Sequence, residues 1–244
     1  MHRSGWISVR AASRRSHSRS WPRSSRYAVI AAAGASRPSR LPSRAEIDPP
    51  RTGGVILAAG EARRFGSQKL LAPLDGRPLV QHVIDSANAS CLEQIVIVAG
   101  ADADDLVRHL TLGRTLLVGN PDPARGLASS LQVGIGALDQ SLHAALVLLG
   151  DIPGVSTALI DELVARGHQT RASAVVSVWR GRRTPPVVLH KSLWSAAFAL
   201  HGDVGMREVL GDRRDVVEFP ITNALGSLDD VDTPADHARV SRSR

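Results

Sequence analysis

From residue 53 onward, the chain alternates short apolar runs with longer amphipathic stretches, and this alternation limits the fold more than any other feature of the sequence. The apolar runs are rich in β-branched residues and long enough for one strand each, whereas the stretches between them have the length of helices. Such an alternation is typical of βαβ units, which build a mostly parallel sheet with helices on both faces. We therefore predict an α/β fold for this part of the chain.

The predicted strands are residues 54–58, 94–99, 115–118, 144–149, 174–178, 186–189 and 216–219. The predicted helices are residues 78–89, 102–110, 127–138, 156–166, 193–200, 205–210 and 234–240. In sheets of this kind, ligands bind at the carboxyl ends of the strands, near the point where strand order reverses. The loops that follow the strands are therefore where we look for a functional site.

Composition excludes several other classes of protein. The chain has 244 residues, of which 43% are hydrophobic and 22% are charged, so it can bury a substantial core. Its single cysteine cannot form an intrachain disulfide or a cysteine-based metal centre. No run of about 18 apolar residues is present, so no membrane-spanning helix is predicted. These features favour a soluble, cytoplasmic protein.

The positive net charge of the chain, +7, comes from its first 52 residues. This segment has 11 Arg, 11 Ser and two acidic residues, whereas residues 53–244 carry a net charge of −2. Because it lacks hydrophobic periodicity, we predict that residues 1–52 are a disordered basic extension, or follow a start codon assigned too far upstream. Residues 53–244 are then one domain. A basic arm for RNA or acidic lipid and a targeting signal are less favoured alternatives, so we predict no nucleic acid and no membrane partner.

The loop after the first strand is suited to bind phosphate. The small residues Ala58, Ala59 and Gly60 leave backbone N–H groups uncovered, so an anionic group can approach them closely. Arg64 adds a planar fork for phosphate oxygens, and Lys69 adds a compact point charge. The loop matches neither the G-x-G-x-x-G pattern nor the Walker loop, which disfavours a dinucleotide oxidoreductase and a P-loop NTPase. A solvated surface loop is the alternative interpretation.

Acidic residues follow two later strands. Asp151 comes at the end of a buried strand, where a carboxylate can hold Mg²⁺ against phosphates, although it could instead cap the helix that starts near Ser156. Asp230 and Asp232 are two residues apart in an extended segment, so both can face a metal, although stabilisation of the following helix dipole is an alternative. Thr233 is the predicted N-cap of that helix.

Taken together, these motifs resemble those of the MobA-like nucleotidyltransferases, and most closely the molybdenum cofactor cytidylyltransferase branch of that family. The resemblance extends over essentially residues 53 to 240. The motifs that carry it are Leu57-Ala58-Ala59-Gly60 with Arg64-Phe65-Gly66 and Lys69, Asn120-Pro121-Asp122 with Gly126-Leu127 and Ser130, Gly150-Asp151-Ile152-Pro153, and Asp230-Val231-Asp232-Thr233-Pro234.

The resemblance implies a single Rossmann-like domain of three layers that transfers CMP from CTP to molybdopterin, with Mg²⁺ as cofactor and pyrophosphate as product. It also implies that a molybdoenzyme receives the finished cofactor. By this resemblance the catalytic residues are Arg64, Lys69 and Asp151. The implied nucleotide-binding residues are Leu57, Ala58, Ala59, Gly60, Arg64, Lys69, Asn120, Gly126 and Ser130. The implied metal ligands are Asp151, Asp232 and Asp230.

The sequence departs from the family pattern at several positions. Ala62 stands where the family often has Ser, and Thr184-Pro185-Pro186 stands where it often has Gly-His-Pro. Ala59, where guanylyltransferases typically have a second Gly, resembles the cytidylyl branch. Asp203 is predicted to cap the helix that starts at residue 205. The family has a similar Gly-Asp-x-Gly stretch near the acceptor, so by resemblance Asp203 and Arg207 are also candidate substrate contacts.

Two other functions stay open at this point. One is guanylyl or other nucleotidyl transfer to a sugar phosphate or another small phosphate acceptor. The other is a non-catalytic chaperone that binds molybdopterin and delivers it to a partner enzyme. The presence of Arg64, Lys69 and Asp151 argues against the chaperone, because a protein that only binds the cofactor does not need the full set of charges.

Overall fold

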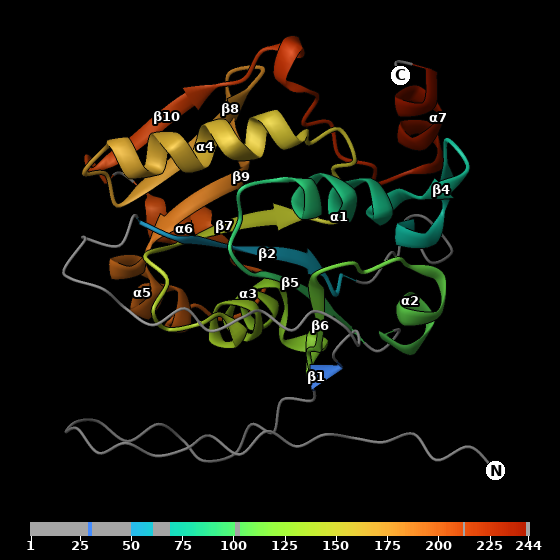
Figure 1. Cartoon of the computed structure of the whole chain (residues 1–244), viewed down its shortest axis with the longest axis horizontal. Helices are drawn as coiled ribbons and strands as arrows, with labels where there is room; N and C mark the ends of the chain where they lie inside the picture. Colours follow the sequence, from blue (N-terminus) through green and yellow to red (C-terminus); the bar gives the residue numbers. More distant parts are fainter. Residues whose placement is uncertain (1–28, 31–49, 61–68, 101–102, 212, 243–244) are drawn as a thin grey trace, which may run out of the picture.

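The computed structural model describes residues 29–30, 50–60, 69–100, 103–211 and 213–242. These residues form a central sheet with helices on both faces, in three layers (Figure 1). The predicted α/β fold with a mostly parallel sheet is therefore confirmed. No helix within the described residues is long and apolar enough to cross a membrane.

The large sheet has eight strands in the order β1-β6-β5-β2-β7-β9-β8-β10. The strands of this sheet are β1 (Val29–Ile30), β2 (Thr52–Ala58), β5 (Ile95–Ala99), β6 (Thr115–Gly119), β7 (Ala144–Leu149), β8 (Ala174–Trp179), β9 (Arg182–His190) and β10 (Val216–Pro220). A separate antiparallel pair is formed by β3 (Pro73–Leu74) and β4 (Arg77–Pro78).

Strand order reverses beside β2. Strands β5 and β6 extend the sheet on one side of β2, and the chain then returns to place β7 on its other side, with all of these pairs parallel. The carboxyl ends of β2 and β7 therefore meet at the switch point, where the sequence predicts a site. Strand β9 is antiparallel to both of its neighbours, β7 and β8.

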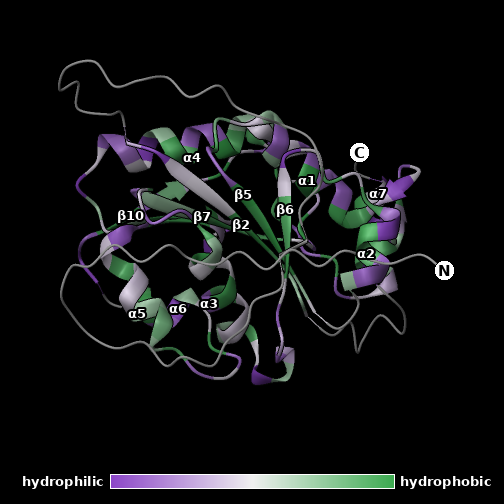
Figure 2. Ribbon diagram, turned by 60° about the horizontal axis from the view of Figure 1, so that its bottom comes forward, coloured by the Kyte–Doolittle hydropathy of each residue, from purple (hydrophilic) through white to green (hydrophobic). Residues whose placement is uncertain are grey.

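The helices pack in two layers with separate hydrophobic cores. The α-helices are α1 (Leu79–Ala89), α2 (Ala103–His109), α3 (Leu127–Ala137), α4 (Thr157–Gln169), α5 (Trp194–Phe198), α6 (Met206–Leu210) and α7 (Pro234–Arg242). Residues of α1, α2, α4 and α7 share one core with the sheet, and residues of α3, α5 and α6 share the other. Figure 2 shows that the strands between the two layers are mostly hydrophobic, whereas helices such as α4 contain both hydrophobic and hydrophilic residues.

Several features differ from the prediction. Strand β2 begins at Thr52, two residues earlier than predicted, and β9 begins at Arg182, four residues earlier than predicted, and ends one residue later, at His190. The hairpin between β8 and β9 turns at Arg180 and Gly181, which both have positive φ. The local sequence gives only a weak signal for the bounds of these strands, because strand pairing depends on partners outside the segment.

The N-terminal extension lies largely outside the described residues. Apart from Thr52 at the start of β2, its described element is β1, which pairs antiparallel with β6 through Val29 opposite Val118 and Ile30 opposite Leu117. This short pairing differs from the expectation that residues 1–52 are unpacked. For the rest of the extension, and for its boundary with the domain, the expectation stays a prediction.

Candidate nucleotide and metal site

A cavity of about 450 Å³ opens at the carboxyl ends of β2 and β7. It takes its walls from the end of β2, from the start of α3 and from the loop after β7. The residues that line it are Leu57, Ala58, Ala59, Gly60, Lys69, Leu70, Pro123, Ala124, Gly126, Leu127, Ser130, Leu149, Asp151 and Asp203. The fold therefore brings most of the predicted nucleotide-binding residues to one place.

Lys69 joins two acidic segments at this cavity. Its Nζ donates to Oδ2 of Asp151 at 2.8 Å and to Oδ1 of Asp232 at 2.9 Å, and only 12% of the Lys69 side chain is exposed. Burial alone would lower the pKa of Lys69, but the two carboxylates outweigh it and raise the pKa above its ordinary value. Lys69 therefore places a positive charge in the wall of the cavity.

Asp151 has a carboxylate oxygen that suits a cation. Its Oδ2 accepts from Lys69, whereas its Oδ1 is buried and has no hydrogen-bond partner within the described structure. The helix α4 is capped by Ser156, whose side chain accepts from the N–H of Leu159, so Asp151 is not needed as a cap. A buried oxygen without a partner is costly, and a metal ion at Oδ1 would satisfy it.

The segment that carries Asp232 is tied to the loop of Asp151. The N–H of Val231 donates to the carbonyl of Asp151 at 3.0 Å. At the start of α7, Thr233 and Asp236 form hydrogen bonds with each other's backbone and side-chain groups. Asp232 takes no part in this cap and accepts from Lys69 instead. The predicted cap at Thr233 is confirmed.

Asp230 lies near the carboxylates of Asp232 and Asp151, but unlike them it is not bonded to Lys69 in the part of the chain that the structure describes. Partial burial, and then the carboxylates of Asp232 and Asp151, raise the pKa of Asp230 above its ordinary value. No hydrogen bond joins it to Lys69 within the described residues. No group of three or more His, Cys, Asp or Glu side chains suited to a metal occurs in that part of the chain. The residues present nevertheless fit Mg²⁺, which usually takes one or two carboxylates and fills its other positions with phosphate and water.

A buried polar network supports the floor of the cavity. Asn120 donates to the hydroxyls of Ser129 and Ser130 at 2.7 and 3.0 Å and accepts from the N–H of Asp122. Ser129 in turn donates to the carbonyl of Gly126. Gly126 and Ser130 of this network line the cavity as predicted, whereas Asn120 does not line it and bonds to Ser130.

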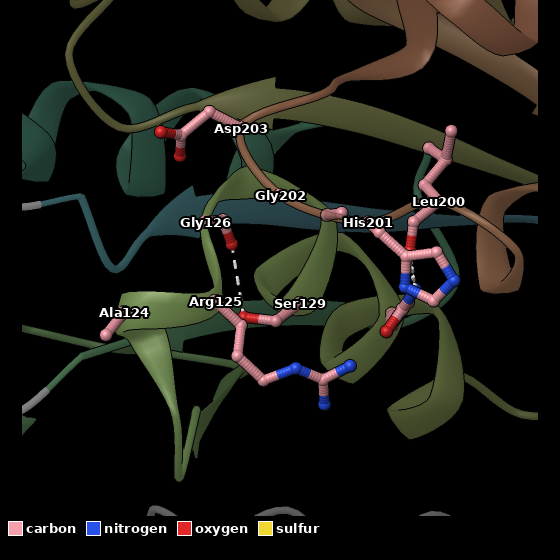
Figure 3. Close-up of a pocket in the computed structure, with 10 residues that line it drawn as sticks. Ala124, Arg125, Gly126, Ser129, Leu200, His201, Gly202 and Asp203 are labelled. Atoms are coloured by element: carbon pink, nitrogen blue, oxygen red, sulfur yellow. Dashed lines mark hydrogen bonds between the residues drawn. The ribbon is translucent and has the colours of Figure 1, made fainter.

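A second cavity, of about 310 Å³, lies beside the first and shares Ala124, Gly126 and Asp203 with it (Figure 3). The loop between α5 and α6 rests on Gly126, where an added Cβ would lie 2.5 Å from Oδ1 of Asp203. Gly126 also has φ of 86°, a conformation that favours glycine.

Asp203 does not have the capping role that was predicted for it, and Leu127 lies at the site although no role was predicted for it. Helix α6 begins at Met206 with Gly205 as its N-cap, so Asp203 does not cap it. Leu127, 38% exposed, lines the larger cavity with Asp203, whereas Arg207 lines neither cavity. A contact between Asp203 and Gly126 could not be read from sequence positions so far apart.

Arg64 lies outside the described residues, as do Ala62 and all other positions in 61–68. Its expected role at the phosphates stays a prediction. Farther along the same edge of the sheet, Trp179 donates to Asp229 at 3.1 Å, and the Arg180 guanidinium lies 5.3 Å from its ring centroid. These two contacts hold the Trp179 side chain in place.

An α/β sheet that gathers an open turn, a fixed cation and two carboxylates at its switch point is the framework of a nucleotide-dependent transferase. A family model described as the MobA-like NTP transferase domain matches residues 54–217. The chain belongs to this family and is a nucleotidyltransferase.

Two curated relatives have different names. A probable molybdenum cofactor guanylyltransferase from Pyrococcus horikoshii is 29% identical over 180 residues, which cover 72% of this chain and 82% of the relative. A nicotine blue oxidoreductase from Paenarthrobacter nicotinovorans is 31% identical over 195 residues, which cover 77% of this chain and 95% of the relative.

Solved structures confirm the fold. Rv0371c from Mycobacterium tuberculosis, in a complex with manganese, is 25% identical and has a TM-score of 0.69 over 80% of this chain and 100% of that chain. The inositol-1-phosphate CTP transferase from T. maritima is 17% identical with a TM-score of 0.62, over 80% of this chain and 94% of that one, which supports the fold alone.

Proposed function

We propose that this protein transfers CMP from CTP to molybdopterin and releases pyrophosphate, with Mg²⁺ as its metal. The observation that carries the proposal is the cavity in which the turn at Ala58–Gly60, Lys69 and Asp151 lie together. A triphosphate needs both backbone donors and cations around its oxygens, and a hard metal needs a carboxylate beside them. All three requirements meet at this cavity.

Each group of residues has a distinct task in the transfer. The backbone N–H groups after β2 bind the triphosphate, with Lys69 and Arg64 as its cations. Asp151 and Asp232 hold Mg²⁺, with Asp230 beside them, and the metal when bound neutralises charge on the phosphate oxygens. An acceptor phosphate is already a nucleophile, so the residues need to align it rather than remove a proton, and we propose no general base.

The choice of CTP is supported by Ala59, which resembles the cytidylyl branch of the family. Guanylyl transfer is the second candidate, because the relative from P. horikoshii is named a guanylyltransferase. That same name supports molybdopterin as the acceptor. In keeping with this acceptor, we propose that the protein acts in the cytoplasm and passes its product to a molybdoenzyme.

The oxidoreductase name of the P. nicotinovorans relative points to a different chemistry. A dinucleotide-dependent oxidoreductase of the common type binds its cofactor at a G-x-G-x-x-G turn after the first strand. Here the first strand is followed by Ala59-Gly60-Glu61-Ala62 instead. We therefore propose nucleotidyl transfer and expect no oxidation of NADH or NADPH.

The test is pyrophosphate release by the purified full chain with Mg²⁺. CTP, GTP and UTP are each paired with molybdopterin and with sugar phosphates, and nicotinamide dinucleotide oxidation is followed in parallel. We expect release with CTP and molybdopterin. Release with GTP would correct the base, and release only with a sugar phosphate would correct the acceptor. A protein that binds molybdopterin but releases no pyrophosphate with any pair would be a chaperone, and the proposal would be wrong.

A further inference from the structure

The acidic segment at residues 227–232 is tied by its backbone to the loop after β7. The N–H of Ser227 donates to the carbonyl of Gly154 at 3.2 Å, and the N–H of Val231 donates to the carbonyl of Asp151 at 3.0 Å. The Val231 side chain is fully buried, so it also anchors the segment to the core. The backbone is thereby held near both ends of the segment.

The middle of the segment is held by the side chain of Asp229, which reaches the hairpin between β8 and β9. Its Oδ1 accepts from Nε1 of Trp179 at 3.1 Å, and its Oδ2 accepts from the Arg180 guanidinium at 3.1 Å. A second guanidinium nitrogen of Arg180 lies 3.0 Å from Oδ1, so this pair is bidentate. A bidentate pair fixes the orientation of a carboxylate as well as its distance.

These bonds give Asp229 a different task from the other acidic residues of the segment. Both of its carboxylate oxygens are engaged by the hairpin, and only 20% of its side chain is exposed. Asp232 accepts from Lys69 instead. Asp229 is therefore committed to the hairpin, and the carboxylates that we propose for the metal are those of its neighbours, Asp230 and Asp232.

The hairpin is a support that the acidic segment shares with Asp151. Strand β9 pairs with β7, which ends two residues before Asp151. Strand β9 also pairs with β8 as far as Arg182 opposite Trp179, at the end of the hairpin that bonds to Asp229. The hydrogen bonds of Asp229 thus link the acidic segment to the same sheet that positions Asp151.

Metal ligands bind tightly only where the groups around them hold them in place. Asp230 follows Asp229 directly in the chain, and Asp232 is three residues farther on, so a shift of Asp229 would move the backbone that carries both. We propose that Asp229 is a positioning residue, which holds Asp230 and Asp232 in place for the metal by binding Trp179 and Arg180. This inference rests on the proposed function and gives the hairpin a role in metal binding.

The test uses two variants of the full chain for which positioning and simple electrostatics predict different results. Trp179→Phe removes the indole N–H and changes no charge, so electrostatics alone would leave metal binding unchanged. Arg180→Gln removes a cation beside the acidic segment, so electrostatics alone would tighten Mn²⁺ binding. If Asp229 positions the segment, both variants should instead bind Mn²⁺ more weakly, by about 3- to 20-fold. Electron paramagnetic resonance of free Mn²⁺ measures this without turnover.

Pyrophosphate release separates positioning of the metal ligands from a general loss of structure. In both variants the Mg²⁺ concentration for half-maximal turnover should rise by the same factor as the loss of Mn²⁺ affinity. At saturating Mg²⁺, kcat should stay within about twofold of wild type, because the ligands themselves are still present. Thermal unfolding checks that each variant is folded.

Arg182→Gln is the matched control, because Arg182 is an exposed arginine of the same hairpin. It should change neither Mn²⁺ affinity nor the dependence of turnover on Mg²⁺. Unchanged Mn²⁺ binding in Trp179→Phe, or unchanged or tighter binding in Arg180→Gln, would overturn the inference, as would a loss of kcat that saturating Mg²⁺ does not restore. A wild type that bound no Mn²⁺ and released no pyrophosphate would instead overturn the proposed function itself.

Discussion

The Nζ of Lys69 lies 2.8 Å from Oδ2 of Asp151, in the position that a cation shared by the acidic segments would take. The same ammonium reaches Asp232 at 2.9 Å. In the structure without ligands, Lys69 therefore neutralises the carboxylates that we propose as metal ligands. Nucleotide and metal binding should then require Lys69 to exchange at least one carboxylate for phosphate oxygens.

Removing this lysine should have opposite effects on metal binding and on turnover. In Lys69→Ala the two carboxylates lose their competing cation, so Mn²⁺ should bind about tenfold more tightly in the absence of nucleotide. Turnover should fall, because a donor to the phosphates is lost. The expected loss of transition-state stabilisation is about 2–4 kcal/mol. Electron paramagnetic resonance of free Mn²⁺ measures the first effect, and pyrophosphate release measures the second.

Lys191→Ala is the control for this prediction, because Lys191 is the other lysine of the chain, exposed and stacked over Trp194. It should change neither quantity. Weaker Mn²⁺ binding in Lys69→Ala would show that the lysine organises the carboxylates rather than competing with the metal.

Asp151→Ala should nearly abolish turnover, by about 100-fold or more, because the phosphate charge is no longer neutralised by a metal held at this position. The fold should remain, since Ser156 caps α4 without Asp151 and Lys69 keeps Asp232 as a partner. Pyrophosphate release and thermal unfolding are measured together, with the exposed Asp104→Ala as control. Activity within about threefold of wild type would remove Asp151 from the metal site.

Two glycines on α3 should respond in opposite directions to the same substitution. A Cβ at Gly134 would lie 2.3 Å from Cγ1 of Val55 in the buried strand β2, whereas the nearest atom to a Cβ at Gly136 is at 4.0 Å. Gly134→Ala should destabilise the protein by about 1–3 kcal/mol through overpacking. Gly136→Ala should stabilise it by about 0.5–1 kcal/mol, because alanine is the better helix former. Urea unfolding measures the free energy of unfolding of both variants. Equal changes in the two would contradict the close packing of Gly134 against Val55.

Stability should fall in mild acid because of His168. Burial, and then the nearby His143, lower the pKa of His168, which lies 2.9 Å from the hydroxyl of Thr52. The folded protein thus keeps His168 neutral where the unfolded chain already binds a proton, so its contribution is present above about pH 6.5 and lost as pH falls. Partial exposure screens the effect, which should stay within about 1 kcal/mol, or about 2–4 °C in Tm.

His168→Gln should flatten this dependence between pH 7.5 and pH 5.5, as measured by thermal melts. The control His109→Gln changes an exposed imidazole on α2 and should leave the wild-type slope in place. An identical slope in His168→Gln and in wild type would assign the acid sensitivity to other groups.

Local patterns in the sequence predict most of the fold. The helix α1 is predicted at 78–89 and observed at Leu79–Ala89, because its buried residues recur at the three- and four-residue spacing of one helical face. Strand β7 is predicted at its observed bounds, since both of its faces are covered and it is apolar throughout. What the sequence does not predict is pairing between distant segments, such as β1 on β6 or the antiparallel insertion of β9.

The same division applies to the site. The turn at Ala58–Gly60 and the position of Asp151 follow from their place at strand ends, which the alternating pattern already defines. The hydrogen bonds of Lys69 to two acidic segments, and the contact of Asp203 with Gly126, depend on tertiary packing that no local spacing encodes. Asp203 was therefore a candidate substrate contact only through a family resemblance.

Lys69 and Asp232 are 163 residues apart in the chain, and Asp232 lies beyond residue 217, where the family match ends. The ion pairs of Lys69 therefore join the segment before β3 to the segment before α7, and they close the fold across most of its described length.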